Sequence, residues 1–218
     1  MDKIIILDPG HGGIVNGVYV TAPKKMYVHE NGPTIYEGVW NREIVKKLEY
    51  ILHGRGIPCV NVAPTAEDTP LKDRVETANR YAKAFDNNAL YISIHANAGG
   101  GKGFEVYTSP GQTKSDEIAE RWVEEMALEF PDRVARGDNS DGDKDKEANF
   151  YVLKHTTCPA ILTESFFMDN LEDAKEMLDY YGMEKVLQAH LRTIEAFLND
   201  DIKPIKKPVK NGGSKRGK

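Results

Sequence analysis

The chain has 218 residues and a formal net charge of −5, with 29 basic and 34 acidic side chains. Seven of the basic residues lie within residues 203–218, which contain no acidic residue. The remaining residues 1–202 therefore carry a net charge of about −12, from 22 basic and 34 acidic side chains. Nucleic-acid binding needs a basic surface that displaces counterions, so this acidic body argues against a nucleic-acid partner.

The hydrophobic content of 40% fits one soluble domain large enough to bury a core. No apolar stretch approaches the roughly 18 residues that span a membrane. The apolar run near the N-terminus is shorter than the roughly 7–15 residues of a secretory signal, so no signal peptide is visible. Two cysteines, Cys59 and Cys158, are too few for a disulfide framework, and we expect both to be buried core residues.

Short apolar runs alternate with helical patterns along the chain. The first run, residues 4–7, ends at the turn signal Asp8-Pro9-Gly10, as a strand buried on both faces would. Apolar residues at helical spacing follow, and Thr69-Pro70 provides an N-cap and first-turn proline for the second helix. In chain order we predict strands at 4–7, 58–62, 90–95, 104–107, 150–153 and 160–163, and helices at 36–52, 70–85, 113–130, 171–180 and 183–198.

This alternation predicts an α/β fold, a single domain with a mostly parallel central sheet and helices on both faces. Residues 131–147 are expected to form an acidic loop. The domain is expected to cover residues 1–202, and the basic segment 203–218 to be a disordered tail or a truncated linker. Ligands of such sheets bind beyond the carboxyl ends of the strands, where we expect the functional site.

Three predicted strands end in a residue suited to metal binding or proton transfer: His11, His95 and Glu164. Glu37 begins the first long helix, and a helix N-terminus lies on the same rim as the strand ends. Two histidines, a carboxylate and an open position form the common catalytic zinc site of hydrolases. A further carboxylate must then take the proton of the zinc-bound water, and Glu164 suits that role.

The other histidines have simpler interpretations. We interpret His53 as compensating the dipole at a helix C-terminus, His190 as a residue on a helix surface and His155 as part of a loop. His29 lies in a segment that could line a pocket, beside the rival carboxylate Glu30.

The segments LDPGHGG, YEGVWN, LKDRVETAN leading to ISIHANA, and PAILTESFFMDN resemble the zinc-dependent N-acetylmuramoyl-L-alanine amidases. These are the cell-wall amidases of autolysins, division amidases and phage endolysins. The resemblance spans about residues 4–198 and keeps the order of the motifs. It implies one Zn2+ ion held by His11, Glu37 and His95, with Glu164 as the catalytic acid/base. It also implies a peptidoglycan substrate, cut between the lactyl group of N-acetylmuramic acid and the L-alanine of the stem peptide.

The family's E-x-x-x-N pattern favours Glu37, with Asn41 four residues later, over Glu30 as the carboxylate ligand. Asn97, Tyr107 and Arg74 are candidates for substrate binding. Arg74 and Asn79 both match family positions. At these positions we expect buried hydrogen bonds that fix the predicted helix at 70–85.

The sequence departs from the family pattern in two places. The connection between His11 and Glu37 is longer than usual, and Ser165 and Phe166 stand where the family usually has a glycine. Phe166 and Phe167 could line a substrate groove or pack in the core.

Two other functions remain open: a zinc peptidase acting within the stem peptide, and a catalytically inactive peptidoglycan-binding module of the same fold. We expect a monomer that acts on the cell wall, outside the cell or in the periplasm, after export by lysis, a phage route or another path. The basic segment is hypothesised to be attracted weakly to anionic wall polymers or membrane.

Overall fold

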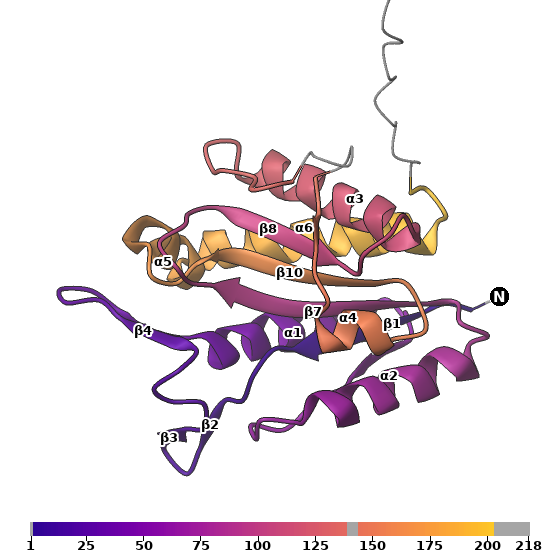
Figure 1. The fold of residues 1–218 in the computed structure, drawn as a ribbon, viewed down its shortest axis with the longest axis horizontal. Helices are drawn as coiled ribbons and strands as arrows, with labels where there is room; N and C mark the ends of the chain where they lie inside the picture. The colour runs from indigo at the N-terminus through magenta and orange to yellow at the C-terminus, as the bar shows by residue number, and fades with distance from the viewer. Residues whose placement is uncertain (1, 139–143, 203–218) are drawn as a thin grey trace, which may run out of the picture.

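The computed structural model describes residues 2–138 and 144–202. Its centre is a six-stranded sheet with strand order β6-β1-β7-β10-β8-β9 (Figure 1). The first four of these strands run parallel, whereas β8 is antiparallel to β10 and β9 is parallel to β8. The expectation of a mostly parallel sheet is confirmed. The strands are β1 (Ile4–Pro9), β6 (Cys59–Asn61), β7 (Ala89–Asn97), β8 (Phe104–Thr108), β9 (Lys146–Glu147) and β10 (Ala160–Phe167).

Helices cover both faces of the sheet, as expected, but unequally. Ile5 and Leu7 of β1 pack into the larger core, whereas Ile4 and Ile6 point to the smaller one, because successive side chains of a strand alternate. In Figure 1, α3 is drawn above β8, α6 passes behind β8 and β10, and α2 lies below β1. The larger core includes α1 (Glu37–Gly54), α3 (Lys114–Glu129), α5 (Leu171–Leu178) and α6 (Tyr180–Leu198), and the smaller includes α2 (Leu71–Ala84) and α4 (Tyr151–His155).

The predicted strand at 150–153 is wrong, because this segment forms the short helix α4. Val152 and Leu153 are buried against the smaller core, whereas Phe150 and Tyr151 are exposed. Four apolar residues in a row fit a buried strand as well as one turn of helix, so periodicity alone could not separate the two.

Two helix starts also differ from prediction. Pro70, and not Thr69, occupies the N-cap of α2, and no side chain caps that helix. The final helix, α6, begins at Tyr180 rather than at residue 183, because the Asp179 side chain accepts a hydrogen bond from the Gly182 N–H and caps it there.

The long connection between β1 and α1 folds into two antiparallel hairpins that the sequence did not predict. The first joins β2 (Ile14–Val15) to β3 (Val18–Tyr19), and the second joins β4 (Met26–Val28) to β5 (Thr34–Tyr36). Asn16 and Gly17 both have positive φ in the first turn, which is the Asn-Gly pattern of a tight hairpin. Both hairpins lie beyond the end of the sheet toward which β7 points (Figure 1).

None of the helices within the described ranges is long and apolar enough to cross a membrane. Residues 139–143 of the predicted acidic loop and the basic segment 203–218 lie outside the described residues.

Candidate metal centre and active site

His11, Glu37 and His95 meet at the carboxyl end of the sheet. Glu37 Oε1 lies 3.1 Å from His11 Nε2 and 3.0 Å from His95 Nδ1. One ligand atom from each residue lies within 4.8 Å of the others. The rival carboxylate Glu30 is exposed in the turn between β4 and β5, outside this group.

The three side chains fit a metal ion. Glu37 is 1% exposed, and its second oxygen, Oε2, has no hydrogen-bond partner in the described part of the chain. His11 Nε2 is likewise buried and without a partner of hydrogen-bond geometry among the described residues. Burial raises the pKa of Glu37, but the close imidazole rings of His11 and His95 outweigh it and hold that pKa well below its usual value. An ionised carboxylate beside two imidazole nitrogens is a donor set that zinc prefers.

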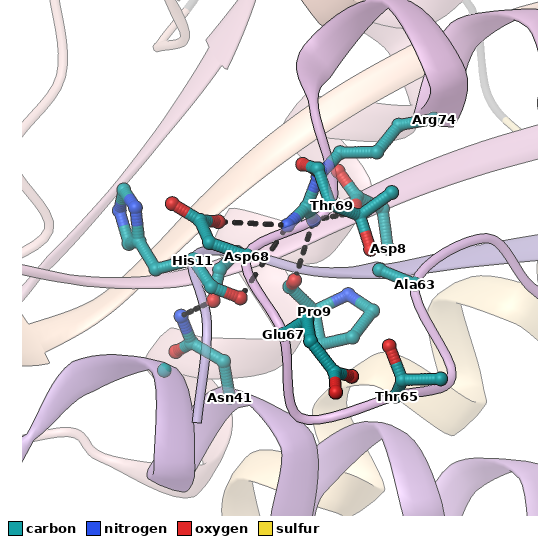
Figure 2. A network of polar contacts seen from close by, with 12 residues as sticks. Asp8, Pro9, His11, Asn41, Ala63, Thr65, Glu67, Asp68, Thr69 and Arg74 are labelled. Carbon is teal, nitrogen blue, oxygen red and sulfur yellow. Dashed lines mark hydrogen bonds and ion pairs between the residues drawn. The ribbon is translucent and has the colours of Figure 1, made fainter. Parts of the chain in front are cut away.

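The loop that carries His11 is fixed by side chains from α1 and α2. His11 has a φ of 61°, a left-handed backbone conformation that costs energy in any residue other than glycine. Three consecutive carbonyls of the loop accept hydrogen bonds that hold it in place, and Figure 2 shows the Arg74 and Asn41 side chains beside it. The pairs are Arg74 to Pro9, Asn41 to Gly10 and Arg42 to His11. Asn41 of the E-x-x-x-N pattern therefore supports the metal-site backbone.

Two glycines allow the close approach of backbone and ligands. A Cβ on Gly10 would lie 2.1 Å from the His95 ring, and one on Gly38 would lie 1.9 Å from the Gly12 carbonyl oxygen. Both distances are far shorter than real Cβ contacts, so the site requires glycine at both positions.

Glu164 lies on β10 directly beside His95 of β7, in register with it. Its Oε2 is buried and has no hydrogen-bond partner within the described ranges. Burial raises the pKa of Glu164 to about 7, although the nearby His95 lowers it. Glu164 lines a cavity of about 450 Å3 together with His11 and His95. A carboxyl group with this pKa can both accept and release a proton near neutral pH.

A buried chain of hydrogen bonds supports His95 from behind. His95 Nε2 lies 3.1 Å from Ser93 Oγ, which donates to Asp8 Oδ2 at 2.8 Å. Asp8 is 1% exposed and also accepts hydrogen bonds from Tyr91 and Arg74. If the ring proton of His95 lies on Nε2 and forms a hydrogen bond to Ser93 Oγ, then Nδ1 has a lone pair that faces Glu37.

Lys25 reaches the same cavity from the loop before β4, and sequence analysis did not find it. Its Nζ lies 3.8 Å from Glu37 Oε2, and it lines the cavity beside Glu164. Lys25 has a left-handed φ of 60°, and its carbonyl accepts hydrogen bonds from the Glu37 N–H and the Tyr19 hydroxyl. The unusual length of the connection was the only signal of an added active-site residue.

The three candidates for substrate binding are placed differently. Arg74 is 2% exposed, and its guanidinium is occupied by Asp8, Asp68 and backbone carbonyls (Figure 2), which confirms the expected buried hydrogen bonding. Asn97 and Tyr107 both donate to the buried carboxylate of Glu105, which lies next to Glu164 across the sheet. Asn79 donates to the carbonyl of His155, the last residue of α4, and accepts from the Thr157 N–H. It therefore ties α2 to α4, but through exposed rather than buried hydrogen bonds.

Two histidine interpretations are wrong. His190 is fully buried rather than on a surface, and its ring contacts Trp122, Thr163 and the Val186 carbonyl. His155 is the last residue of α4 rather than part of a loop, and its ring stacks on Tyr151.

The remaining two histidines do not join the metal group. His53 lies in the last turn of α1, as expected. His29 Nε2 lies 3.0 Å from the Met168 carbonyl oxygen.

Phe166 and Phe167 are both core residues. Phe166 is fully buried with its ring 4.9 Å from that of Phe130, and it has a φ of 76° where the family usually has glycine. Phe167 is 3% exposed. Of the two free cysteines, Cys158 is buried as expected, whereas Cys59 is only half-buried.

Known proteins share both the sequence pattern and the fold. A family model described as N-acetylmuramoyl-L-alanine amidase matches residues 5–196. The chain is 27% identical to a sporulation-specific N-acetylmuramoyl-L-alanine amidase of Bacillus subtilis, over 89% of this chain and 68% of that one. It is 32% identical to an endolysin of Bacillus phage SPP1, over 98% of this chain and 70% of the endolysin.

Solved structures agree with these relatives in fold. The crystal structure of an N-acetylmuramoyl-L-alanine amidase from Clostridium difficile 630 has a TM-score of 0.72 at 24% identity, over 91% of this chain and 97% of that one. The amidase AmiC2 of Nostoc punctiforme has a TM-score of 0.70 at 25% identity, over 90% and 97%. The match of the family model to nearly the whole described domain shows that the chain belongs to the N-acetylmuramoyl-L-alanine amidase family of amide hydrolases.

Proposed function

We propose that this protein is a zinc-dependent amidase of peptidoglycan that hydrolyses the amide bond between the lactyl group of N-acetylmuramic acid and the L-alanine of the stem peptide. The observation that carries the proposal is the position of Glu164. This carboxyl group, with its pKa raised to about 7, lies beside His95 of the group formed by His11, Glu37 and His95, and it lines a cavity together with His11 and His95.

The residues divide the reaction between them. A zinc ion held by His11, Glu37 and His95 would polarise the scissile carbonyl and lower the pKa of water toward ~7. Glu164 accepts the proton of the attacking water on its carboxylate. It then donates that proton to the alanine nitrogen as this nitrogen leaves. Because burial raises the pKa of Glu164 to about 7, both its protonated and its ionised form are populated near neutral pH, so one group can serve both steps.

Glu164→Gln tests this assignment. The amide keeps the size of the side chain but cannot accept a proton, so we expect turnover of purified sacculi to fall by at least a hundredfold. Zinc content, measured by atomic emission after dialysis, should stay at one ion per chain. A variant that retained wild-type turnover would contradict the role of Glu164.

Mass spectrometry of the released products separates the alternatives. The proposed amidase releases peptides with a new amino terminus at L-alanine. A zinc peptidase acting within the stem peptide would leave a different new amino terminus. A catalytically inactive binding module would retain sacculi without releasing any amine.

The relatives support action on the cell wall, since they include a sporulation-specific amidase and an endolysin. We propose peptidoglycan as the macromolecular substrate and a monomer as the active form.

A further inference from the structure

His95 of β7 and Glu164 of β10 lie side by side across the sheet, and the row they form continues onto the neighbouring strand β8. Glu164 of β10 is in register with His95 of β7 on one side and with Glu105 of β8 on the other. Residues paired directly across neighbouring strands project from the same face of a sheet, about 5 Å apart. Glu105 therefore follows Glu164 in a line that starts at the metal group.

Glu105 is a buried hub for four side chains. It is 3% exposed, and Oε1 accepts hydrogen bonds from Asn97 Nδ2 at 2.6 Å and from the Tyr107 hydroxyl at 2.7 Å. Oε2 accepts from Arg136 Nε at 3.0 Å and from Lys146 Nζ at 2.5 Å. Such a carboxylate holds its partners in fixed positions, because moving any of them would leave a buried charge with fewer hydrogen bonds.

The two cations of this cluster exceed the charge of the carboxylate that holds them. Arg136 and Lys146 bring two positive charges to the single negative charge of Glu105. Both remain accessible, with side chains 40% and 26% exposed. Each also lies over an aromatic ring, Arg136 at 5.1 Å from the centre of Phe167 and Lys146 at 5.7 Å from that of Tyr107. The cations are thus oriented and exposed beside the catalytic row.

We propose that Arg136 and Lys146, positioned by Glu105, form a binding site for a carboxylate of the stem peptide, the one nearest to the L-alanine. This inference rests on the proposed function. It also assigns Glu105 as a positioning residue, since it acts through the two cations and its own oxygens are occupied.

The direction of the substrate follows from the order of the row. The scissile carbonyl belongs at the metal group, and Glu164 must reach the alanine nitrogen that leaves. The peptide that continues from that nitrogen therefore runs away from the metal group, toward Glu105. Neighbouring strands are about 4.8 Å apart, and one residue of extended chain spans about 3.5 Å. The carboxylate of the residue after alanine then falls at the two cations.

The closing experiment uses two synthetic muramoyl-L-alanyl peptides that differ only in the carboxylate of the residue after alanine, free in one and amidated in the other. For the wild type, kcat/KM should be roughly 10- to 100-fold higher for the free carboxylate, the difference that a charge-assisted hydrogen bond supplies. Arg136→Met and Lys146→Met should each reduce this ratio, and the double variant should bring it close to one. Glu105→Gln should also reduce the ratio, chiefly through KM of the free carboxylate.

Matched controls lie on the opposite face of the sheet. Arg192 pairs with two glutamates of α3 at 33% exposure, and Lys47 pairs with Glu184 at 31%. Arg192→Met and Lys47→Met should leave the ratio of the two substrates at its wild-type value. A wild-type ratio near one, or a ratio that survives in the double variant, would overturn the carboxylate site. Because hydrolysis of the amidated peptide needs no such site, failure to cleave either substrate would instead overturn the proposed function.

Discussion

Ser93 illustrates how a residue that is not itself a candidate metal ligand can set the properties of the proposed metal site. Its hydroxyl lies between His95 Nε2 and the buried carboxylate of Asp8. This contact orients the imidazole, and a proton on Nε2 that is hydrogen-bonded to Ser93 leaves the Nδ1 lone pair facing Glu37. Partners of this kind commonly change metal affinity by about 10- to 100-fold.

Ser93→Ala should therefore weaken zinc binding by roughly 10- to 100-fold, measured by competition with a chromogenic chelator. Ser165→Ala is the control, because Ser165 is also a fully buried serine of the central sheet but its hydroxyl has no hydrogen-bond partner in the described chain. Equal zinc affinity in the wild type and Ser93→Ala would show that the Asp8 chain does not act on His95.

Among single residues, the sequence predicted those that chemical type and position at the end of a strand identify by themselves. His11, His95 and Glu164 each follow or end an apolar run, so the parallel topology placed them on one rim. The roles of Ser93 and Glu105 depend on which side chains face each other across strands. Strand order and register decide this, and the sequence does not display them.

At the scale of elements, the buried histidine of α6 links the helix to the sheet. Burial lowers the pKa of His190 to about 4, and the neutral ring is held by Trp122 of α3 and Thr163 of β10. An unfolded histidine titrates near 6.5. Between about pH 6.5 and 4 the unfolded chain therefore binds more protons than the folded chain at this position. The contribution of His190 to folding stability is complete above this window and is lost as the pH falls through it.

Comparing the wild type with His190→Gln isolates this contribution. Between pH 7 and pH 4 the wild type should lose about 3 kcal/mol of unfolding free energy more than the variant, as measured by urea denaturation. His155→Gln is the control, because His155 is exposed on the short helix α4 and should leave the pH dependence unchanged. Parallel pH dependences for the wild type and His190→Gln would contradict the assignment.

Elements were predictable where many residues shared one pattern. The buried strands of a parallel sheet are continuous apolar runs, and the long helices carry regular apolar spacing. The helix α4 has five residues, too few to show a period, and so was mistaken for a strand. The hairpins of residues 14–36 were missed because their strands contain only two or three residues each.

At the scale of the whole molecule, the proposed metal site brings together parts of the chain that are far apart in sequence. Its residues come from the loop after β1, the start of α1 and the end of β7. Unfolding separates these segments, so a metal that binds the folded site stabilises the entire domain.

Zinc removal should therefore lower the melting temperature. Free zinc at a thousandfold excess over Kd contributes about 4 kcal/mol, which in a chain of this size corresponds to roughly 10 °C. Differential scanning calorimetry of dialysed protein with and without zinc measures this shift. Glu164→Gln should keep the shift and His95→Ala should lose it. A melting temperature that does not respond to zinc in the wild type would contradict a metal site at these residues.

The two hairpins between β1 and α1 have a consequence for how this protein could be altered. Their ends are attached through the backbone: the Gly13 N–H donates to the Ala66 carbonyl, and the Glu37 N–H donates to that of Lys25. The three metal-site residues lie outside the segment, and only Lys25 within it reaches the cavity. The segment therefore contributes one side chain to the cavity and none of the three candidate ligands. Hairpins of other lengths that kept Lys25 and the contacts of Tyr19 with Gly38 and of His29 with Met168 would change the surface around the cavity while leaving His11, Glu37 and His95 in place.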